Sequence, residues 1–389
     1  MRLLVATDHR FVLAEGRICD AYGFNGAFFS DYLTQFDEVE VACRVRHGLD
    51  SEATQLSEGP GLEFLRMPDF RGIGWLRALS PHNLGVIRAA VDRANAVCVR
   101  IPSTIGYLTA RMARRQGRPV MFEMIGDPAA TNRGAWDRGG IAGRASAFLA
   151  RRAISYAVAG SYVSLGHLQQ RYPPRRPAMC DAISSIRLPD WAILVPRPER
   201  NAGPLKVICV ASLVPVKDHA VLLRAAGLAI SKGACSELIL VGDGVERARL
   251  ERLAQALGVR NAVRFCGHIA ERSVIDRLLD EADIFALASM SEGLPRAMIE
   301  AMARGLPVIG TRTGGIAELV PPECSVAVGD YPGLAELITR LASSPAQMAE
   351  LSVRSVQMAG NFVQSKLSEK RRRLLAHLRA VAITRGESK

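Results

Sequence analysis

The stretch from residue 282 to 320 constrains the fold most, because it reads as two successive strand–loop–helix units. Ile284–Ala288 is a short apolar run, typical of a strand that is buried on both faces. Pro295 suits the first position of a helix over Arg296–Arg304. Another buried strand, Val308–Gly310, and a Gly-Gly turn follow. This order predicts a parallel sheet whose helices begin at one common edge.

Two carboxylates flank the first of these helix starts. Glu292 lies just before the helix, and Glu300 lies on it eight positions later. The unpaired N–H groups at a helix start suit a phosphate, and a carboxylate can accept hydrogen bonds from two adjacent hydroxyls. The pattern predicts a grip on two sugar rings joined by a diphosphate. The alternative is that Glu292 only favours the helix dipole and Glu300 only pairs with Arg296 or Arg304.

The segment Ser-Glu-Gly-Leu-Pro-x3-Ile-Glu-Ala-Met-Ala-x-Gly-Leu-Pro-Val-Ile-x-Thr-x-x-Gly-Gly-Ile resembles the donor site of retaining glycosyltransferases of family 4. The resemblance implies an α/β chain with the GT-B fold, in which two Rossmann-like domains face a cleft. It implies that Glu292 contacts the donor sugar and Glu300 the nucleotide ribose, with Gly293 and Leu294 also at the donor. The resemblance is specific over about residues 205–330.

Alternating apolar and polar segments predict β-α units on both sides of a proline-rich stretch. We expect an acceptor-side domain at 1–190, a linker at 191–204 and a nucleotide-sugar-binding domain at 205–360. The resemblance implies that the last helix, 361–389, returns to the first domain.

The loop after the first strand of the second domain contains Lys217, just before an expected helix. A cation there has the wrong sign for the helix dipole, and a bound phosphate would offset this. The resemblance implies that Lys217 contacts the donor diphosphate. Ser212 stands where the family commonly has an arginine, so this chain has one cation fewer at that point.

Further donor contacts follow from the resemblance. Gly242 lies in a Gly-Asp-Gly turn after a strand, and the main chain of Ile269 is the expected contact for the base. Gly26, with Asn25 beside it in Tyr-Gly-Phe-Asn-Gly, is the expected contact of the first domain with the diphosphate. An ordinary turn is the alternative for Asn25 and Gly26.

Glu123 and Asp127 follow an expected strand of the first domain and are candidates for contact with the acceptor or the donor sugar. Many relatives have a histidine in this region, and this chain does not. The alternative for Asp127 is an N-cap, with Pro128 as the first helical residue.

Arginine is concentrated in residues 101–200, which contain 15 arginines, no lysine and 6 acidic residues. This favours contact with an anionic membrane or a phosphate-bearing acceptor, and solvated helix faces are the alternative. The chain has no recognised nucleic-acid module. No Cys-x-x-Cys pair and no long apolar run occur. We therefore expect a cytoplasmic protein, either free or at the inner face of the membrane.

The implied reaction moves a sugar from a nucleotide-diphosphate sugar to a hydroxyl of a glycan or lipid-linked acceptor, with retention, in polysaccharide or glycoconjugate synthesis. No Asp-x-Asp motif occurs. We therefore expect no metal, and no cofactor besides the nucleotide-sugar. The alternatives are a nucleotide-sugar 2-epimerase of similar architecture and a non-catalytic sugar-nucleotide-binding subunit.

Overall fold

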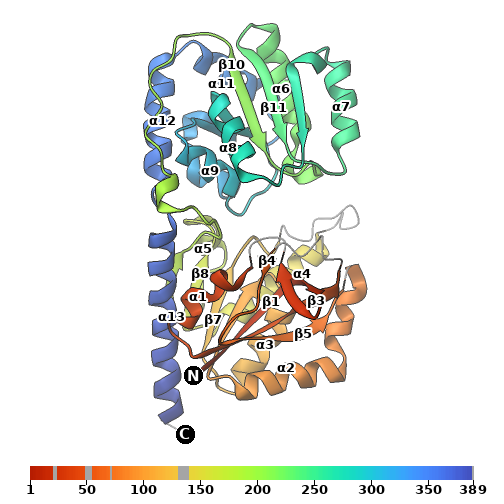
Figure 1. The fold of residues 1–389 in the computed structure, drawn as a ribbon, viewed down its shortest axis with the longest axis vertical. Helices are drawn as coiled ribbons and strands as arrows, with labels where there is room; N and C mark the ends of the chain where they lie inside the picture. Colours follow the sequence, from red (N-terminus) through yellow and green to blue (C-terminus); the bar gives the residue numbers. More distant parts are fainter. Residues whose placement is uncertain (21–23, 49–54, 71, 130–139, 388–389) are drawn as a thin grey trace. The chain divides into compact units, whose positions relative to one another are not determined.

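The computed structural model describes residues 1–20, 24–48, 55–70, 72–129 and 140–387. It divides into two compact units (Figure 1). Unit 1 contains Met1–Ser184 and Leu367–Lys389, and unit 2 contains Ser185–Lys366. Each unit is built on a mainly parallel sheet, which confirms the predicted α/β class. Residues 191–204 lie within unit 2.

The sheet of unit 1 has the strand order β4-β2-β1-β6-β7-β8-β9, with β3 on β1 and β5 on β3. Its central strands are buried on both faces because their side chains are almost all apolar. The strands are β1 (Arg2–Ala14), β2 (Arg17–Asp20), β3 (Glu38–His47), β4 (Gln55–Leu56), β5 (Leu62–Pro68), β6 (Ala96–Ile101), β7 (Val120–Met124), β8 (Ala159–Tyr162) and β9 (Met179–Ala182).

The first strand, β1, is long and runs from Arg2 to Ala14. Its apolar second half pairs with β3, and the chain then turns at Glu15 and Gly16, which both have positive φ. The returning β2 is antiparallel to β1. Asp8, at a shift in the β1 register, accepts hydrogen bonds from Thr104 N–H at 2.7 Å and Ile105 N–H at 3.0 Å. Asp8 thus caps the start of α3.

Helices cover the sheet of unit 1. They are α1 (Ser30–Leu33), α2 (Pro81–Arg93), α3 (Thr104–Arg115), α4 (Ile141–Ile154) and α5 (His167–Arg171), with 3-10 turns at Gly26–Phe29 and Gly72–Leu79. From Leu367 onward, the last helix, α13 (Gln364–Glu387), also belongs to unit 1.

The basic run on α13 forms ion pairs and is not simply a solvated face. Arg371 and Arg372 contact Asp31 of α1, at 2.9 and 3.1 Å. Lys370 contacts Asp181 of β9 at 3.1 Å, and Arg373 contacts the same carboxylate. Leu374, Leu375 and Leu378 are fully buried on this helix.

The sheet of unit 2 is parallel, with the order β12-β11-β10-β13-β14-β15. The strands are β10 (Leu205–Val210), β11 (Cys235–Val241), β12 (Val263–Gly267), β13 (Ile284–Leu287), β14 (Val308–Thr311) and β15 (Ser325–Val326). The helices are α6 (His219–Ser231), α7 (Arg247–Ala256), α8 (Arg272–Glu281), α9 (Arg296–Ala303), α10 (Ile316–Leu319), α11 (Tyr331–Ala342) and α12 (Pro345–Ala359). This order is that of a doubly wound sheet, and it reverses between β10 and β13.

Candidate active site

The reversal point of the unit 2 sheet brings two loops together. Ligands of such sheets bind beyond the carboxyl ends of the strands at this point. The loop at 211–218 follows β10, and the loop at 288–295 follows β13. Met290 N–H donates to the Val216 carbonyl oxygen at 2.8 Å, which joins the two loops. Both loops carry residues that we predicted from the sequence to contact the donor, Lys217 in the first loop and Glu292 in the second.

Lys217 and Glu292 form an ion pair across these loops. Ser289 Oγ donates a hydrogen bond to Oε1 of Glu292 at 2.8 Å. Lys217 contacts the same oxygen. The exposed fraction is 24% for the Lys217 side chain and 11% for that of Glu292. Charges that are partly removed from water interact more strongly than surface charges. The structure thus places one cation and one carboxylate in direct contact at the reversal point.

Two glycines bring a third loop against this one. A Cβ on Gly314 would lie 2.0 Å from the carbonyl oxygen of Glu292. A Cβ on Gly315 would lie 2.1 Å from the carbonyl oxygen of Gly293. Side chains at these positions would collide with backbone, so the Gly-Gly pair permits the close approach of the loops after β13 and β14. This packing supports the backbone that carries Glu292.

Glu300 on α9 pairs with Arg272, the first residue of α8, with 2.7 Å between Oε2 and Nη1. The sequence suggested Arg304 as an alternative partner, but Arg304 pairs with Asp280 at the end of α8. Sequence reasoning missed Arg272. One signal was available, because a cation at the first position of a helix opposes the helix dipole.

The other candidates in unit 2 lie on neighbouring loops. Gly242, with φ of 136°, packs so tightly that a Cβ there would lie 2.1 Å from the Ala211 carbonyl oxygen. This glycine therefore shapes the loop that carries Ser212, which is exposed. Ile269 is half-buried in the loop after β12. Donor contacts of Ser212, Gly242 and Ile269 stay predictions.

Asn25 and Gly26 belong to unit 1. The Asn25 side chain accepts a hydrogen bond from Phe28 N–H at 3.2 Å and donates to Gln55 at 2.9 Å. It thus stabilises the 3-10 turn that begins at Gly26. The preceding residues 21–23, part of the predicted loop, lie outside the described residues. Diphosphate contact by Asn25 and Gly26 stays a prediction.

Glu123 lies at the end of β7, and its carboxylate is buried. Tyr32 donates its hydroxyl to Oε1 at 2.6 Å, and Arg100 contacts Oε2. Burial and the neighbouring Glu123 carboxylate raise the pKa of Tyr32. The Arg100 guanidinium also lies 5.0 Å from the ring centres of Phe24 and Phe28. Both carboxylate oxygens of Glu123 have partners within unit 1, and contact with a sugar stays a prediction.

Asp127 precedes a turn at Pro128 and Ala129, and residues 130–139, which would continue a helix from Pro128, lie outside the described residues, so the alternative N-cap role stays a prediction. The next described helix, α4, begins only at Ile141. Asp127 accepts from Ala129 N–H at 2.9 Å and from the Tyr172 hydroxyl at 2.7 Å, and it pairs with Arg171 at 2.9 Å. Burial, followed by the Asp127 hydrogen bond, raises the pKa of Tyr172 to about 12. Sugar contact by Asp127 stays a prediction.

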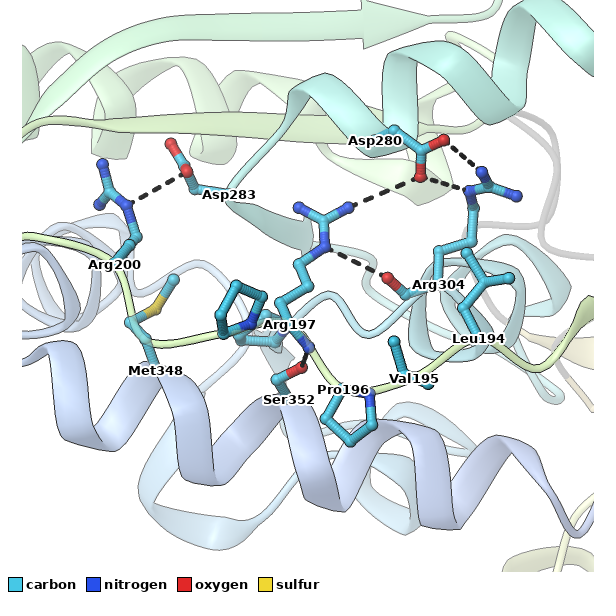
Figure 2. Close-up of a pocket in the computed structure, with 12 residues that line it drawn as sticks. Leu194, Val195, Pro196, Arg197, Arg200, Asp280, Asp283, Arg304, Met348 and Ser352 are labelled. Atoms are coloured by element: carbon cyan, nitrogen blue, oxygen red, sulfur yellow. Dashed lines mark hydrogen bonds and ion pairs between the residues drawn. The ribbon is translucent and has the colours of Figure 1, made fainter.

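A cavity of about 400 Å³ lies at the opposite edge of the unit 2 sheet (Figure 2). Arg197 fills it and donates to the carbonyl oxygens of Leu279 at 2.8 Å and Arg304 at 3.2 Å, where α8 and α9 end. Figure 2 also shows its contact with Asp280, while Arg200 pairs with Asp283 at 3.3 Å. The polar groups of Arg197, Arg200 and Arg304 are already paired with Asp280, Asp283 and backbone carbonyl oxygens, so this region holds segment 194–200 against the helices and is not the donor site.

Two negative findings apply to the described part of the chain. Among these residues, no group of three or more histidine, cysteine, aspartate or glutamate side chains is placed to hold a metal ion. No helix within the same ranges has both the length and the hydropathy needed to cross a bilayer.

Comparison with known sequences agrees with the motif in unit 2. Residues 194–357 match the family of glycosyl transferases group 1. The chain is 25% identical to protein CapJ of Staphylococcus aureus over 82% of this chain and 81% of CapJ. It is 34% identical to the amylovoran biosynthesis glycosyltransferase AmsK of Erwinia amylovora over 37% of this chain and 38% of AmsK. The chain thus matches less than two thirds of the length of AmsK.

Solved structures match the whole chain. Anabaena HepE in complex with UDP has a TM-score of 0.65 at 17% identity, with 100% of both chains covered. The sucrose-phosphate synthase of Thermosynechococcus elongatus has a TM-score of 0.71 at 17% identity, with 98% of this chain and 99% of that chain covered. The chain therefore has the GT-B fold, and its residues 194–357 match the glycosyl transferases group 1, the family 4 glycosyltransferases.

Proposed function

We propose that this chain is a retaining glycosyltransferase that moves a sugar from a nucleotide-diphosphate sugar to a hydroxyl of a glycan or lipid-linked acceptor. The observation that carries the proposal is the contact between Lys217 and Glu292 at the reversal point of the sheet. The two groups have opposite charges and suit opposite parts of a donor. An ammonium suits the diphosphate, and a carboxylate suits the sugar hydroxyls.

The ion pair suggests how donor binding proceeds. Lys217 exchanges its contact with Glu292 for a phosphate oxygen, and Glu292 then accepts from hydroxyls of the donor sugar. Ser289 keeps the carboxylate in place during this exchange, because it bonds to the same oxygen. Negative charge grows on the leaving diphosphate in the transition state, and a fixed ammonium stabilises that charge more than it stabilises the ground state.

Glu300 has the complementary task at the nucleotide. Its Oε2 contacts Arg272, and a carboxylate has further lone pairs that can accept from the two ribose hydroxyls. In this proposal Arg272 is a positioning residue, because it acts on the nucleotide only through Glu300.

The relatives support a role in polysaccharide or glycolipid assembly. AmsK is named for amylovoran biosynthesis, and another relative, 34% identical over 38% of this chain, is the lipopolysaccharide core glycosyltransferase LpsD of Rhizobium meliloti. Donors differ among the similar proteins. HepE was solved with UDP-glucose, and a Corynebacterium glutamicum relative is named as GDP-mannose-dependent.

The test is a transfer assay with UDP-, GDP- and ADP-sugars, with extracted lipid-linked and free glycans as acceptors and with EDTA present. We expect one nucleotide class to give a glycosylated product that keeps the anomeric configuration of the donor. Formation of an epimeric nucleotide-sugar without acceptor would indicate a 2-epimerase. Tight nucleotide binding without transfer to any acceptor would indicate a non-catalytic subunit, and either result would contradict the proposal.

A further inference from the structure

Helices α3 and α4 of unit 1 pack side by side and enclose a groove of about 600 Å³. The Tyr107 hydroxyl lies 3.2 Å from Ser146 Oγ and joins the two helices. The outward sides of the helices carry arginines and large apolar side chains. We call these residues the α3–α4 surface: Arg111, Arg114, Arg115, Ile141, Arg144, Phe148, Leu149, Arg151 and Arg152.

Three apolar side chains of α4 are unusually exposed. The exposed fraction is 75% for Ile141, 58% for Phe148 and 44% for Leu149. Ile141 and Phe148 are seven residues apart, so they lie on the same side of the helix. The opposite side of α4 contacts the unit through small buried residues such as Ala150. Large apolar side chains gathered on one outward helix face mark an interaction surface more often than a solvated one.

The charged groups of this surface have no acidic partner in the described part of the chain. All six arginines of the α3–α4 surface are exposed, and among the described residues none of them forms an ion pair with an acidic side chain. The described acidic residues between the two helices, Glu123 and Asp127, already pair with Arg100 and Arg171. This distinguishes the surface from the basic run of α13, whose four cations contact Asp31 and Asp181.

Three arginines of the α3–α4 surface are held against aromatic rings, and the guanidinium carbon of Arg151 lies 4.9 Å from the ring centre of Tyr172. The Arg114 guanidinium carbon lies 3.5 Å from the ring centre of Tyr156, and that of Arg152 lies 5.8 Å from the ring centre of Phe148. A guanidinium stacked in this way keeps its N–H edges free for a phosphate oxygen. The groove beneath thus combines apolar walls with phosphate-binding edges.

We propose that the α3–α4 surface binds an anionic phospholipid bilayer. Phe148, Leu149 and Ile141 enter the boundary between headgroups and acyl chains, and the arginines contact lipid phosphates. Apolar and basic side chains side by side on an amphipathic helix are the pattern of a helix that lies in the membrane interface. The proposal does not depend on the donor site, because it concerns only unit 1. Membrane binding would bring the enzyme to the bilayer in which a lipid-linked acceptor is anchored.

The test uses the full-length chain and vesicles of phosphatidylcholine alone or mixed equally with phosphatidylglycerol. We expect co-sedimentation with the mixed vesicles only, and less of it at high salt. Replacing Arg144, Arg151 and Arg152 by glutamine should lower the partition coefficient by about fivefold for each arginine. The double variant Phe148→Ser, Leu149→Ser should lower it by at least about tenfold.

Matched controls come from exposed residues of unit 2. Arg252→Gln with Arg277→Gln, and Val245→Ser, should leave vesicle binding unchanged. Circular dichroism and transfer to a water-soluble acceptor check that each variant is folded. The proposal is overturned if the two kinds of vesicle bind equally, if the α4 variants bind like the controls, or if the α4 substitutions instead dissociate a dimer of a chain that does not bind vesicles.

Discussion

Arg272 at the start of α8 contacts Glu300 in the middle of α9, with 2.7 Å between the two charged groups. The contact ties together two helices that follow different strands of the sheet, and it fixes one oxygen of the carboxylate that we assign to the ribose. Arg272 also pairs with Asp276 on its own helix at 2.9 Å. The Arg272–Glu300 ion pair therefore positions the Glu300 carboxylate, and the sequence motif around Glu300 does not include Arg272.

The Arg272→Gln variant tests this role. We expect nucleoside diphosphate affinity to fall about two- to fivefold, which is the usual range for a partly exposed ion pair. Affinity for the 2′,3′-dideoxy nucleotide should stay unchanged, because it lacks the hydroxyls that Glu300 would bind. Arg277→Gln is the matched control on the same helix. Equal losses for both nucleotides, measured by calorimetric titration, would mean that Arg272 does not act through Glu300.

A second prediction concerns the close packing of the loops. Gly314→Ala places a methyl group where the Glu292 carbonyl oxygen lies, at a position with φ of 44°. We expect the free energy of unfolding to fall by about 1–3 kcal/mol and nucleotide affinity to fall with it, because the loop that carries Glu292 must move. Gly227→Ala on α6 is the control, since a Cβ there meets its nearest neighbour at an ordinary 3.7 Å. Urea denaturation of both variants measures the difference, and equal stability would contradict the packing argument.

The buried side chain of His219 should make the free energy of unfolding depend on pH. It is buried at the start of α6, and burial, helped by the nearby Lys217, lowers its pKa to about 4. The unfolded chain, with a histidine pKa near about 6.5, binds the proton more readily than the folded chain. The free energy of unfolding should therefore fall as the pH drops from about 6.5 to 4, and this contribution should be complete above about 6.5.

The matched comparison is the wild type with His219→Gln, unfolded in urea at several pH values. The free energy of unfolding of the variant should fall less steeply below about pH 6.5 than that of the wild type, even if the variant is less stable at every pH. Exposed His268→Gln should keep the wild-type pH dependence. An unchanged decline in His219→Gln would mean that other groups cause it.

Sequence predicts this fold well because buried parallel strands are nearly continuous apolar runs. Ile284–Ala288 and Val308–Gly310 were predicted as strands from this pattern alone, and β13 and β14 lie there. The hairpin formed by β1 and β2 was missed, because the apolar residues from Phe11 onward continue the first strand past a polar interruption.

Site residues could be predicted from the sequence where a local motif contains them. Contacts between residues of two distant segments could not be predicted. Glu292 and Lys217 each have a recognisable neighbourhood, but their direct contact depends on the register between β10 and β13. The hydrogen bond between Tyr32 and Glu123 joins residues 91 positions apart, so no local sequence pattern predicts it. Arg272 likewise depends on how α8 packs beside α9.

The central claim is that the Lys217–Glu292 pair binds the diphosphate and the sugar of the donor. Its most direct test is calorimetric titration of Lys217→Met with the nucleoside diphosphate that the transfer assay identifies. A charge-assisted contact to phosphate is worth about 1.5–3 kcal/mol, so the dissociation constant should rise about 10- to 150-fold. Lys232→Met, an exposed lysine at the end of α6, should bind like the wild type. A folded Lys217→Met variant with unchanged affinity would contradict the account.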